Sequence, residues 1–134
     1  MANTGRIAGK DLYVSFNGTV ISGDQTSVSW SEEGDMADVT AAADAFHYYV
    51  YMRKDGTLDF EAFFDASSTT AYAACAVGVA GTLIVGPAGT ASGKPKYTWT
   101  RAVVASRGMA IPFDDGVTWP CTFQFSSAVS EGAY

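Results

Sequence analysis

Five carboxylates fall within the segment 32–44, and they are the first residues whose type and spacing suggest chemistry. Clustered oxygen ligands suit a calcium ion. The segment nevertheless lacks the D-x-D-x-D-G series with a closing glutamate that an EF-hand requires. We therefore expect a solvated loop, kept extended by its own charge, and no metal site. The carboxylates are those of Glu32, Glu33, Asp35, Asp38 and Asp44.

A second acidic group, Asp59, Glu61 and Asp65, follows later in the chain. A glycosidase needs two carboxylates on either side of a cleft. Asp59 and Glu61 instead alternate along one expected strand, which is typical of its solvated face. Nucleophilic serine catalysis has no support either, because no serine lies in a G-x-S-x-G elbow.

The two cysteines, Cys75 and Cys121, fit neither a dense disulfide framework nor a zinc pattern with four closely spaced ligands. We expect buried free thiols rather than a disulfide. Neither cysteine lies in a motif that would pair it with His47, the single histidine, for catalysis. The sequence thus predicts no catalytic residue, no metal and no cofactor, and we expect a protein that is not an enzyme.

The length and composition of the chain indicate one domain of modest size. The chain has 134 residues, of which 48% are apolar, enough for a single sizeable core. Its formal net charge of −6 should repel free nucleic acid on average. No apolar run approaches the roughly 20 residues of a membrane span, so none is expected. We expect residues 1–9 to form a flexible N-terminal arm and residues 10–134 to form a single β domain.

Alternating apolar residues and frequent turn residues predict an all-β fold, a β-sandwich or barrel-like domain with one short flanking α-helix. Asn17-Gly18 and Asp55-Gly56 are hairpin signals, because such residues tolerate positive φ. The helix is expected over 69–77, where Tyr72 and Cys75 begin an apolar stripe at helical spacing. Strands are expected over 10–16, 19–21, 26–30, 45–53, 57–64, 81–85, 96–104, 108–113 and 117–129.

The strand expected over 45–53 is apolar on both faces. This is more apolar surface than one small core can cover. One face carries Phe46, Tyr48, Val50 and Met52, and the other carries His47, Tyr49 and Tyr51. Aromatic residues are enriched at protein interfaces, and open sheet edges must be blocked or paired. The acidic connection over 32–44 is also longer than most loops inside a compact domain. Together these features predict that copies of the chain cover one another.

In the order of these features the chain resembles the tail tube (major tail) proteins of long-tailed bacteriophages. The resemblance spans roughly Lys10 to Ser126 and rests on shared order more than on any single motif. Its segments are Trp30 before the acidic loop with Asp38-Val39-Thr40, then Gly56-Thr57-Leu58-Asp59-Phe60-Glu61-Ala62, the Asp65 to Val77 helix, Gly81-Thr82-Leu83-Ile84-Val85, and Ile111-Pro112-Phe113-Asp114-Asp115-Gly116-Val117-Thr118 running into Thr122-Phe123-Gln124-Phe125.

The resemblance implies a β-sandwich with a flanking helix, assembled into hexameric rings that stack into a tube. The implied location is the virion tail, assembled in the host bacterial cytoplasm beside other tail proteins. The implied interior is an acidic conduit through which DNA passes without lasting contact. We expect His47, Tyr49 and Tyr51 at the subunit interface. We expect the contacts between rings in the loop from Glu32 to Ala45, through Glu32, Glu33, Asp35, Met36, Asp38 and Asp44.

Other functions remain open from the sequence. A tail terminator ring or a capsid decoration protein would have a similar size and β content. A carbohydrate- or calcium-binding β-sandwich module is a second alternative, from a different class.

Overall fold

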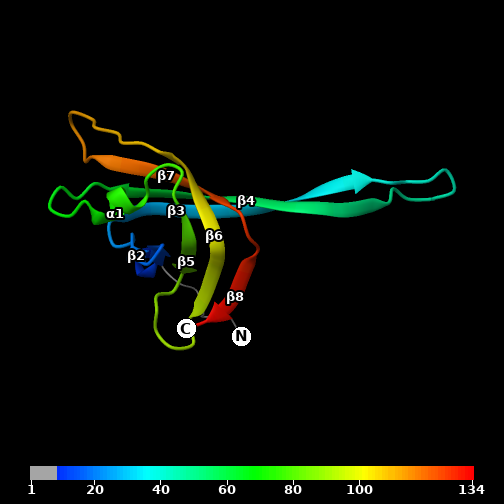
Figure 1. The fold of residues 1–134 in the computed structure, drawn as a ribbon, viewed down its shortest axis with the longest axis horizontal. Coiled ribbons are helices and arrows are strands. Elements are labelled where there is room, and N and C mark those ends of the chain that lie inside the picture. Colours follow the sequence, from blue (N-terminus) through cyan, green and yellow to red (C-terminus); the bar gives the residue numbers. More distant parts are fainter. Residues whose placement is uncertain (1–8) are drawn as a thin grey trace, which may run out of the picture.

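A computed structural model describes residues 9–134, whose eight strands form one antiparallel sheet (Figure 1). A 3-10 turn at Gly9–Asp11 precedes the first strand, and one short helix, α1 (Thr70–Ala74), lies between the fourth and fifth. The strands are β1 (Tyr13–Phe16), β2 (Thr19–Val20), β3 (Gln25–Asp38), β4 (Tyr49–Phe63), β5 (Ala80–Gly86), β6 (Pro95–Arg107), β7 (Thr118–Phe125) and β8 (Val129–Ala133).

The sheet folds over at β6, which brings its two halves face to face. The strand order is β2-β1-β5-β6-β7-β4-β3, and β8 also pairs with β6. Residues 95–99 of β6 pair with β8, and residues 102–107 pair with β7. The ring of Phe16 in β1 lies 4.9 Å from that of Phe123 in β7, across the interior. The predicted all-β fold with a flanking helix is confirmed.

The core follows the period-2 alternation of the strands. In β7 the side chains of Trp119, Cys121, Phe123 and Phe125 are buried, while their neighbours are not. The ring of Trp99 stacks on Phe125, with ring centres 4.2 Å apart and planes at 10°. The remaining buried apolar residues are Val14, Phe16, Ile21, Leu58, Phe60, Ala62, Cys75, Leu83, Val85, Ala102 and Val104.

The first hairpin signal is confirmed. Asn17 and Gly18 have φ of 51° and 83° and connect β1 to β2. The second signal is wrong, because β4 runs through Asp55-Gly56 without turning. Gly56 instead allows a close approach. A Cβ there would lie 2.7 Å from the Ser31 carbonyl oxygen and 2.8 Å from the Phe125 ring, which is the other common reason for a strand glycine.

The expected acidic loop over 32–44 is also corrected. Residues 32–38 belong to β3, and the connection between β3 and β4 covers only residues 39–48. Glu32 pairs with Gly56, and Asp38 pairs with Tyr49. The ladder satisfies the backbone of this exposed segment, so its polar side chains do not prevent it from forming a strand.

Helix α1 is shorter than the expected 69–77. The Asp65 carboxylate accepts hydrogen bonds from the Ser67 N–H and hydroxyl, at 2.9 and 2.6 Å, and Thr69 provides no side-chain cap. Gly78, with φ of 89°, lies just beyond the helix. The ring of Tyr72 packs edge-on against Trp119, which fixes this short element to the core.

The C-terminal part differs from expectation in two places. Residues 108–117 form a loop with one isolated bridge, between Ala110 and Thr118, rather than a strand over 108–113. Pro112 lacks the N–H that a ladder needs. The strand expected over 117–129 is two strands, because residues 126–128 carry the chain from β7 to β8 on another part of β6. Alternation continues through the break and does not reveal the change of partner.

The N-terminal arm predicted over 1–9 lies outside the described residues except for Gly9, which begins the 3-10 turn. Among residues 9–134, no helix has the length and apolar character needed to cross a membrane.

Candidate assembly surface on a projecting hairpin

Strands β3 and β4 continue well past the folded body as a two-stranded ribbon (Figure 1). We call residues 32–55 the projecting hairpin. All of its residues are exposed except Ala37, which is half-buried. Toward the body, the same strands join the sheet, where Leu58 and Phe60 of β4 are buried. The projecting hairpin is thus a continuation of the core strands into solvent.

An irregularity in the β3–β4 ladder decides which side chains share a face of the projecting hairpin. Gly34 pairs with Lys54, but Met36 pairs with Tyr51, so β4 contains one residue more than β3 in this interval. Such a bulge reverses the alternation beyond it. Tyr51 therefore lies on the same side as the buried Leu58, rather than on the solvated side. Its ring covers Gly34, where a Cβ would lie 2.2 Å from a Tyr51 ring carbon.

The projecting hairpin carries large apolar side chains with no core to cover them. Phe46 is 87% exposed, and Tyr49 and Tyr51, both predicted interface residues, are about half exposed. Soluble monomers rarely leave this much contiguous apolar surface uncovered. The exposed large apolar residues of the projecting hairpin are Met36, Val39, Phe46, Tyr48, Tyr49, Val50, Tyr51 and Met52.

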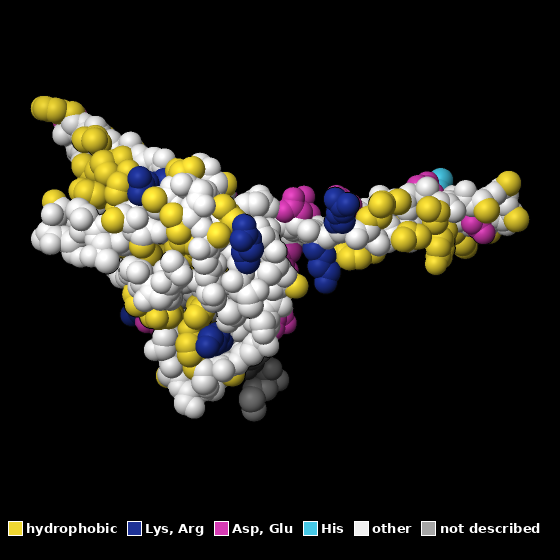
Figure 2. Space-filling model, in the orientation of Figure 1, with side chains coloured by type: hydrophobic (Ala, Val, Ile, Leu, Met, Phe, Trp, Pro, Cys, Tyr) yellow, Lys and Arg dark blue, Asp and Glu magenta, His cyan; other side chains and the backbone are white. Residues whose placement is uncertain are grey.

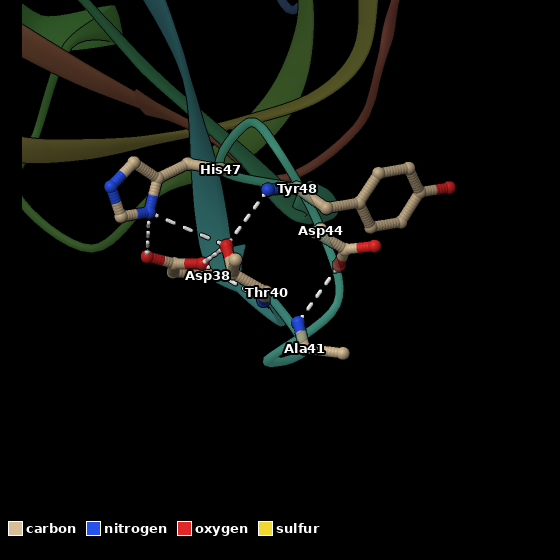
Figure 3. Close-up of polar contacts among 6 residues, drawn as sticks. All are labelled: Asp38, Thr40, Ala41, Asp44, His47 and Tyr48. Carbon is tan, nitrogen blue, oxygen red and sulfur yellow. Dashed lines mark hydrogen bonds and ion pairs between the residues drawn. The ribbon is translucent and has the colours of Figure 1, made fainter.

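A polar network shapes the tip of the projecting hairpin (Figure 3). One carboxylate oxygen of Asp38 accepts from the Thr40 N–H at 3.0 Å and from the Thr40 hydroxyl, and the other lies 3.1 Å from His47 Nδ1. The Thr40 hydroxyl oxygen in turn accepts from the Tyr48 N–H at 2.8 Å. Asp44 closes the turn by accepting from the Ala41 N–H at 2.8 Å. The tip is therefore a defined shape rather than a loose loop.

Hydrogen bonding to the Asp38 carboxylate favours its charged form. The Thr40 hydroxyl contributes most, followed by the Thr40 backbone N–H, and together they lower the pKa of Asp38. The slight burial of this group acts in the opposite direction. His47 adds a smaller contribution of the same sign as Thr40.

The structure separates the predicted contact residues into three groups. Glu32 and Glu33 lie at the root of the projecting hairpin, Asp35 and Met36 lie midway along its β3 arm, and Asp38 and Asp44 lie at the tip. Of the predicted interface residues, His47 joins the tip network, and its ring centre lies 6.1 Å from that of Tyr49.

Sequence reasoning missed the part that Thr40 and Tyr48 play in the tip. The only signal was Asp38-Val39-Thr40, a spacing that suits an aspartate bonding to the backbone two residues on.

A cavity of about 520 Å³ lies where the projecting hairpin meets the body. Its walls include Glu32, Tyr51 and Lys54 from the projecting hairpin, with Trp99 and Phe125 from the core. Trp99 Nε1 is buried and has no hydrogen-bond partner among residues 9–134. No three His, Cys, Asp or Glu side chains within residues 9–134 are grouped so that they could hold a metal ion.

Both cysteines are free and buried, as predicted from the sequence. Cys75, at the end of α1, and Cys121, in β7, are in side-chain contact. The contact with Cys75, together with burial, raises the pKa of the Cys121 thiol. A thiol held neutral in the core is unsuited to nucleophilic chemistry.

Comparison with known proteins identifies the fold. No family model matches the sequence, and no curated protein matches it. Solved structures do match. The SPP1 tail tube has a TM-score of 0.78 at 8% identity, covering 96% of this chain and 80% of that chain. The sheath/tube terminator of an extracellular contractile injection system, PVC, has a TM-score of 0.77 at 13% identity, covering 98% and 100%.

A third match is the tail of an empty gene transfer agent particle, determined with C6 symmetry. Its TM-score is 0.74 at 14% identity, and the match covers 96% of this chain and 100% of that chain. Because the matches span almost the entire chain, the shared element is the whole fold and not a common motif. The predicted resemblance is confirmed at the level of the fold, and this chain has the fold of tail tube proteins.

Proposed function

We propose that the chain is the repeating subunit of a tail tube, a structural protein that forms hexameric rings stacked into a hollow conduit. It would act in the tail of a virion or a related particle, beside other tail proteins, after assembly in the host bacterial cytoplasm. The observation that carries the proposal is the projecting hairpin, a continuation of the core strands whose apolar side chains are exposed on a chain with the tube fold.

Sheet edges supply the lateral contacts in this proposal. Among the described strands, β3 pairs only with β4, so the outer edge of a long strand is free. A free edge is a template for pairing with another chain, and identical pairings form a ring when the rotation closes. The C6 symmetry of the gene transfer agent tail supports six copies for each ring.

The residues of the projecting hairpin divide between two kinds of contact. We assign ring stacking to Glu32, Glu33, Asp35, Met36, Asp38 and Asp44, and the subunit interface to His47, Tyr49 and Tyr51. Tyr49 and Tyr51 lie on one face of the projecting hairpin, as a single apolar interface requires. The net charge of −6 suits a conduit that does not bind DNA phosphates.

The test is negative-stain electron microscopy of the purified protein, together with a variant in which Asn-Gly replaces residues 35–53. Gly34 and Lys54 face each other in the ladder, so a two-residue turn can join them. We expect tubes from the unsubstituted protein and folded subunits without tubes from the variant. Val77→Ser, at an exposed valine in the connection between α1 and β5, is the control and should still form tubes. Tubes of normal length from the shortened variant would contradict the proposal.

A tube terminator is a second candidate, because one of the matched structures is a sheath/tube terminator. The same images separate the two functions. A terminator should give single rings that do not elongate at high protein concentration.

A further inference from the structure

Two thiols from different elements meet in the core, and neither has a role in the proposed function. Cys75 follows α1 directly, Cys121 lies in β7, and their side chains are in contact. Both are free, and neither is more than 1% exposed. Oxidation can join two adjacent thiols, whereas an isolated buried cysteine lacks a partner.

The packing around the two thiols keeps them adjacent. The ring of Tyr72 in α1 lies edge-on against Trp119 of β7, with ring centres 5.5 Å apart. The Cys75 N–H donates to the Tyr72 carbonyl at 3.3 Å. Beyond it, the Gly78 N–H donates to the Val104 carbonyl of β6 at 2.9 Å. The chain is therefore attached to the sheet on both sides of Cys75, and the two thiols remain neighbours as long as α1 is folded.

Cys75 is the more reactive thiol of the pair. The hydrogen bond from the Cys121 thiol lowers the pKa of Cys75, burial acts against it, and the charge of Arg107 lowers it again. Arg107 pairs with Cys121 in the β6–β7 ladder, and its guanidinium lies over the ring of Tyr72. The thiolate is the form that reacts with oxidants. Cys75 therefore reacts first, and Cys121 resolves the product.

We propose that Cys75 and Cys121 are a redox-sensitive pair, which a peroxide converts into an intramolecular disulfide that fastens α1 to β7. The Cys75 sulfur attacks one oxygen of hydrogen peroxide, the O–O bond breaks, and the thiol proton leaves with the other oxygen as water. The Cys121 sulfur then attacks the sulfur of the Cys75 sulfenic acid. The S–O bond breaks, the S–S bond forms, and the departing hydroxide takes the Cys121 proton as a second water. The two thiols lose two electrons in total, and the peroxide is reduced to two waters.

Peroxide reaches the buried pair when α1 opens. The helix has only five residues and no side-chain cap, so it opens locally at a lower free energy than the core strands. Under the proposed function, the subunit folds in a reducing cytoplasm, where thiols stay free, and the released particle meets oxidising surroundings. The bond forms within one subunit, so it can be measured whether or not tubes form.

The test is mass spectrometry of the reduced, folded protein after treatment with hydrogen peroxide. The peroxide is removed, the protein is unfolded, and the free thiols are alkylated with iodoacetamide. We expect both alkylation sites to be lost. After digestion, the peptides containing Cys75 and Cys121 should be linked and two hydrogens lighter than the separate peptides. Dithiothreitol should restore both alkylation sites.

The exposed methionines show whether the peroxide treatment was effective. Met36 and Met52 lie on the projecting hairpin, whose exposed apolar side chains are visible in Figure 2. Treatment is continued until both are sulfoxides. Free thiols at Cys75 and Cys121 at that stage would overturn the inference, as would a disulfide between two subunits.

Cys121→Ser separates the two steps of the reaction. Without a resolving thiol, the Cys75 sulfenic acid should persist and be captured by dimedone, and no linked peptides should form. The oxidised unsubstituted protein should melt at a higher temperature than the reduced protein, because the bond restricts the unfolded chain. Cys121→Ser should show no such rise. An oxidised unsubstituted protein that melts at a lower temperature than the reduced one would contradict a bond that fastens α1 to β7.

Discussion

Gly56 marks the point where the projecting hairpin leaves the body, and it has no room for a side chain. Replacing it with alanine would force a methyl group against the Ser31 carbonyl oxygen and the Phe125 ring. Overpacking of this kind costs about 1–3 kcal/mol. We expect Gly56→Ala to lower the free energy of unfolding by that amount in urea titrations. Gly132→Ala, where a Cβ meets nothing within 4 Å, is the control and should change it little.

The tip network predicts a pH dependence that belongs to Asp38. Because hydrogen bonds from Thr40 lower its pKa, the network stabilises the tip above the ordinary aspartate value of about 3.9. That contribution is lost as the pH falls through the lower folded value. The Thr40 and Tyr48 amide signals in NMR should therefore keep their positions down to a pH below 3.9. In Thr40→Val the pH at the midpoint of this signal change should rise. An unchanged midpoint would contradict the assignment to Asp38.

At the scale of elements, α1 is too short to persist through helix propensity alone. Arg107 of β6 holds it, since its guanidinium lies 4.1 Å over the Tyr72 ring and Nη1 donates to the Tyr72 carbonyl at 2.7 Å. Hydrogen bonds from charged groups contribute about 1.5–3 kcal/mol. We expect Arg107→Ala to lower the unfolding free energy by that range in denaturant titrations. Arg101→Ala, at an exposed position in the same strand, should change it by less than about 0.5 kcal/mol.

The strands most readily predicted from the sequence are those whose two faces differ. The alternation of β7 and the inner half of β4 indicated correctly which side chains are buried, whereas in β1 Ser15 is buried beside Val14 and Phe16. The hairpin signals Asn17-Gly18 and Asp55-Gly56 were ambiguous, because a glycine can serve either of two purposes. Gly18 supplies positive φ at a turn, whereas Gly56 supplies space inside a strand. Only the tertiary neighbours Ser31 and Phe125 distinguish these cases, and they are distant in sequence.

The candidate site was predicted in composition but not in shape. The excess of apolar side chains over 46–52 was visible in the sequence, and the structure leaves them exposed. The side that Tyr51 occupies depends on the bulge opposite Gly34 and Met36, which is a property of the pairing and not of either strand.

At the scale of the whole molecule, the net charge of −6 predicts weak binding to DNA. Assembled tubes should not retain double-stranded DNA in a filter-binding assay at about 50 mM salt, where counterion release favours binding most strongly. Retention that falls steeply with added salt would indicate a cationic lining and contradict an acidic conduit. DNA retention by tubes reassembled at about 200 mM salt is the comparison.

β4 belongs to both the projecting hairpin and the core, and this has a mechanical consequence. Over Thr57–Phe63 it pairs with β7, through hydrogen bonds that run perpendicular to the strand. A pull on the tip along β4 therefore loads these bonds together, in shear, rather than unzipping them one at a time. In the proposed tube, tension applied through the projecting hairpin would be borne by the backbone ladders of the subunits.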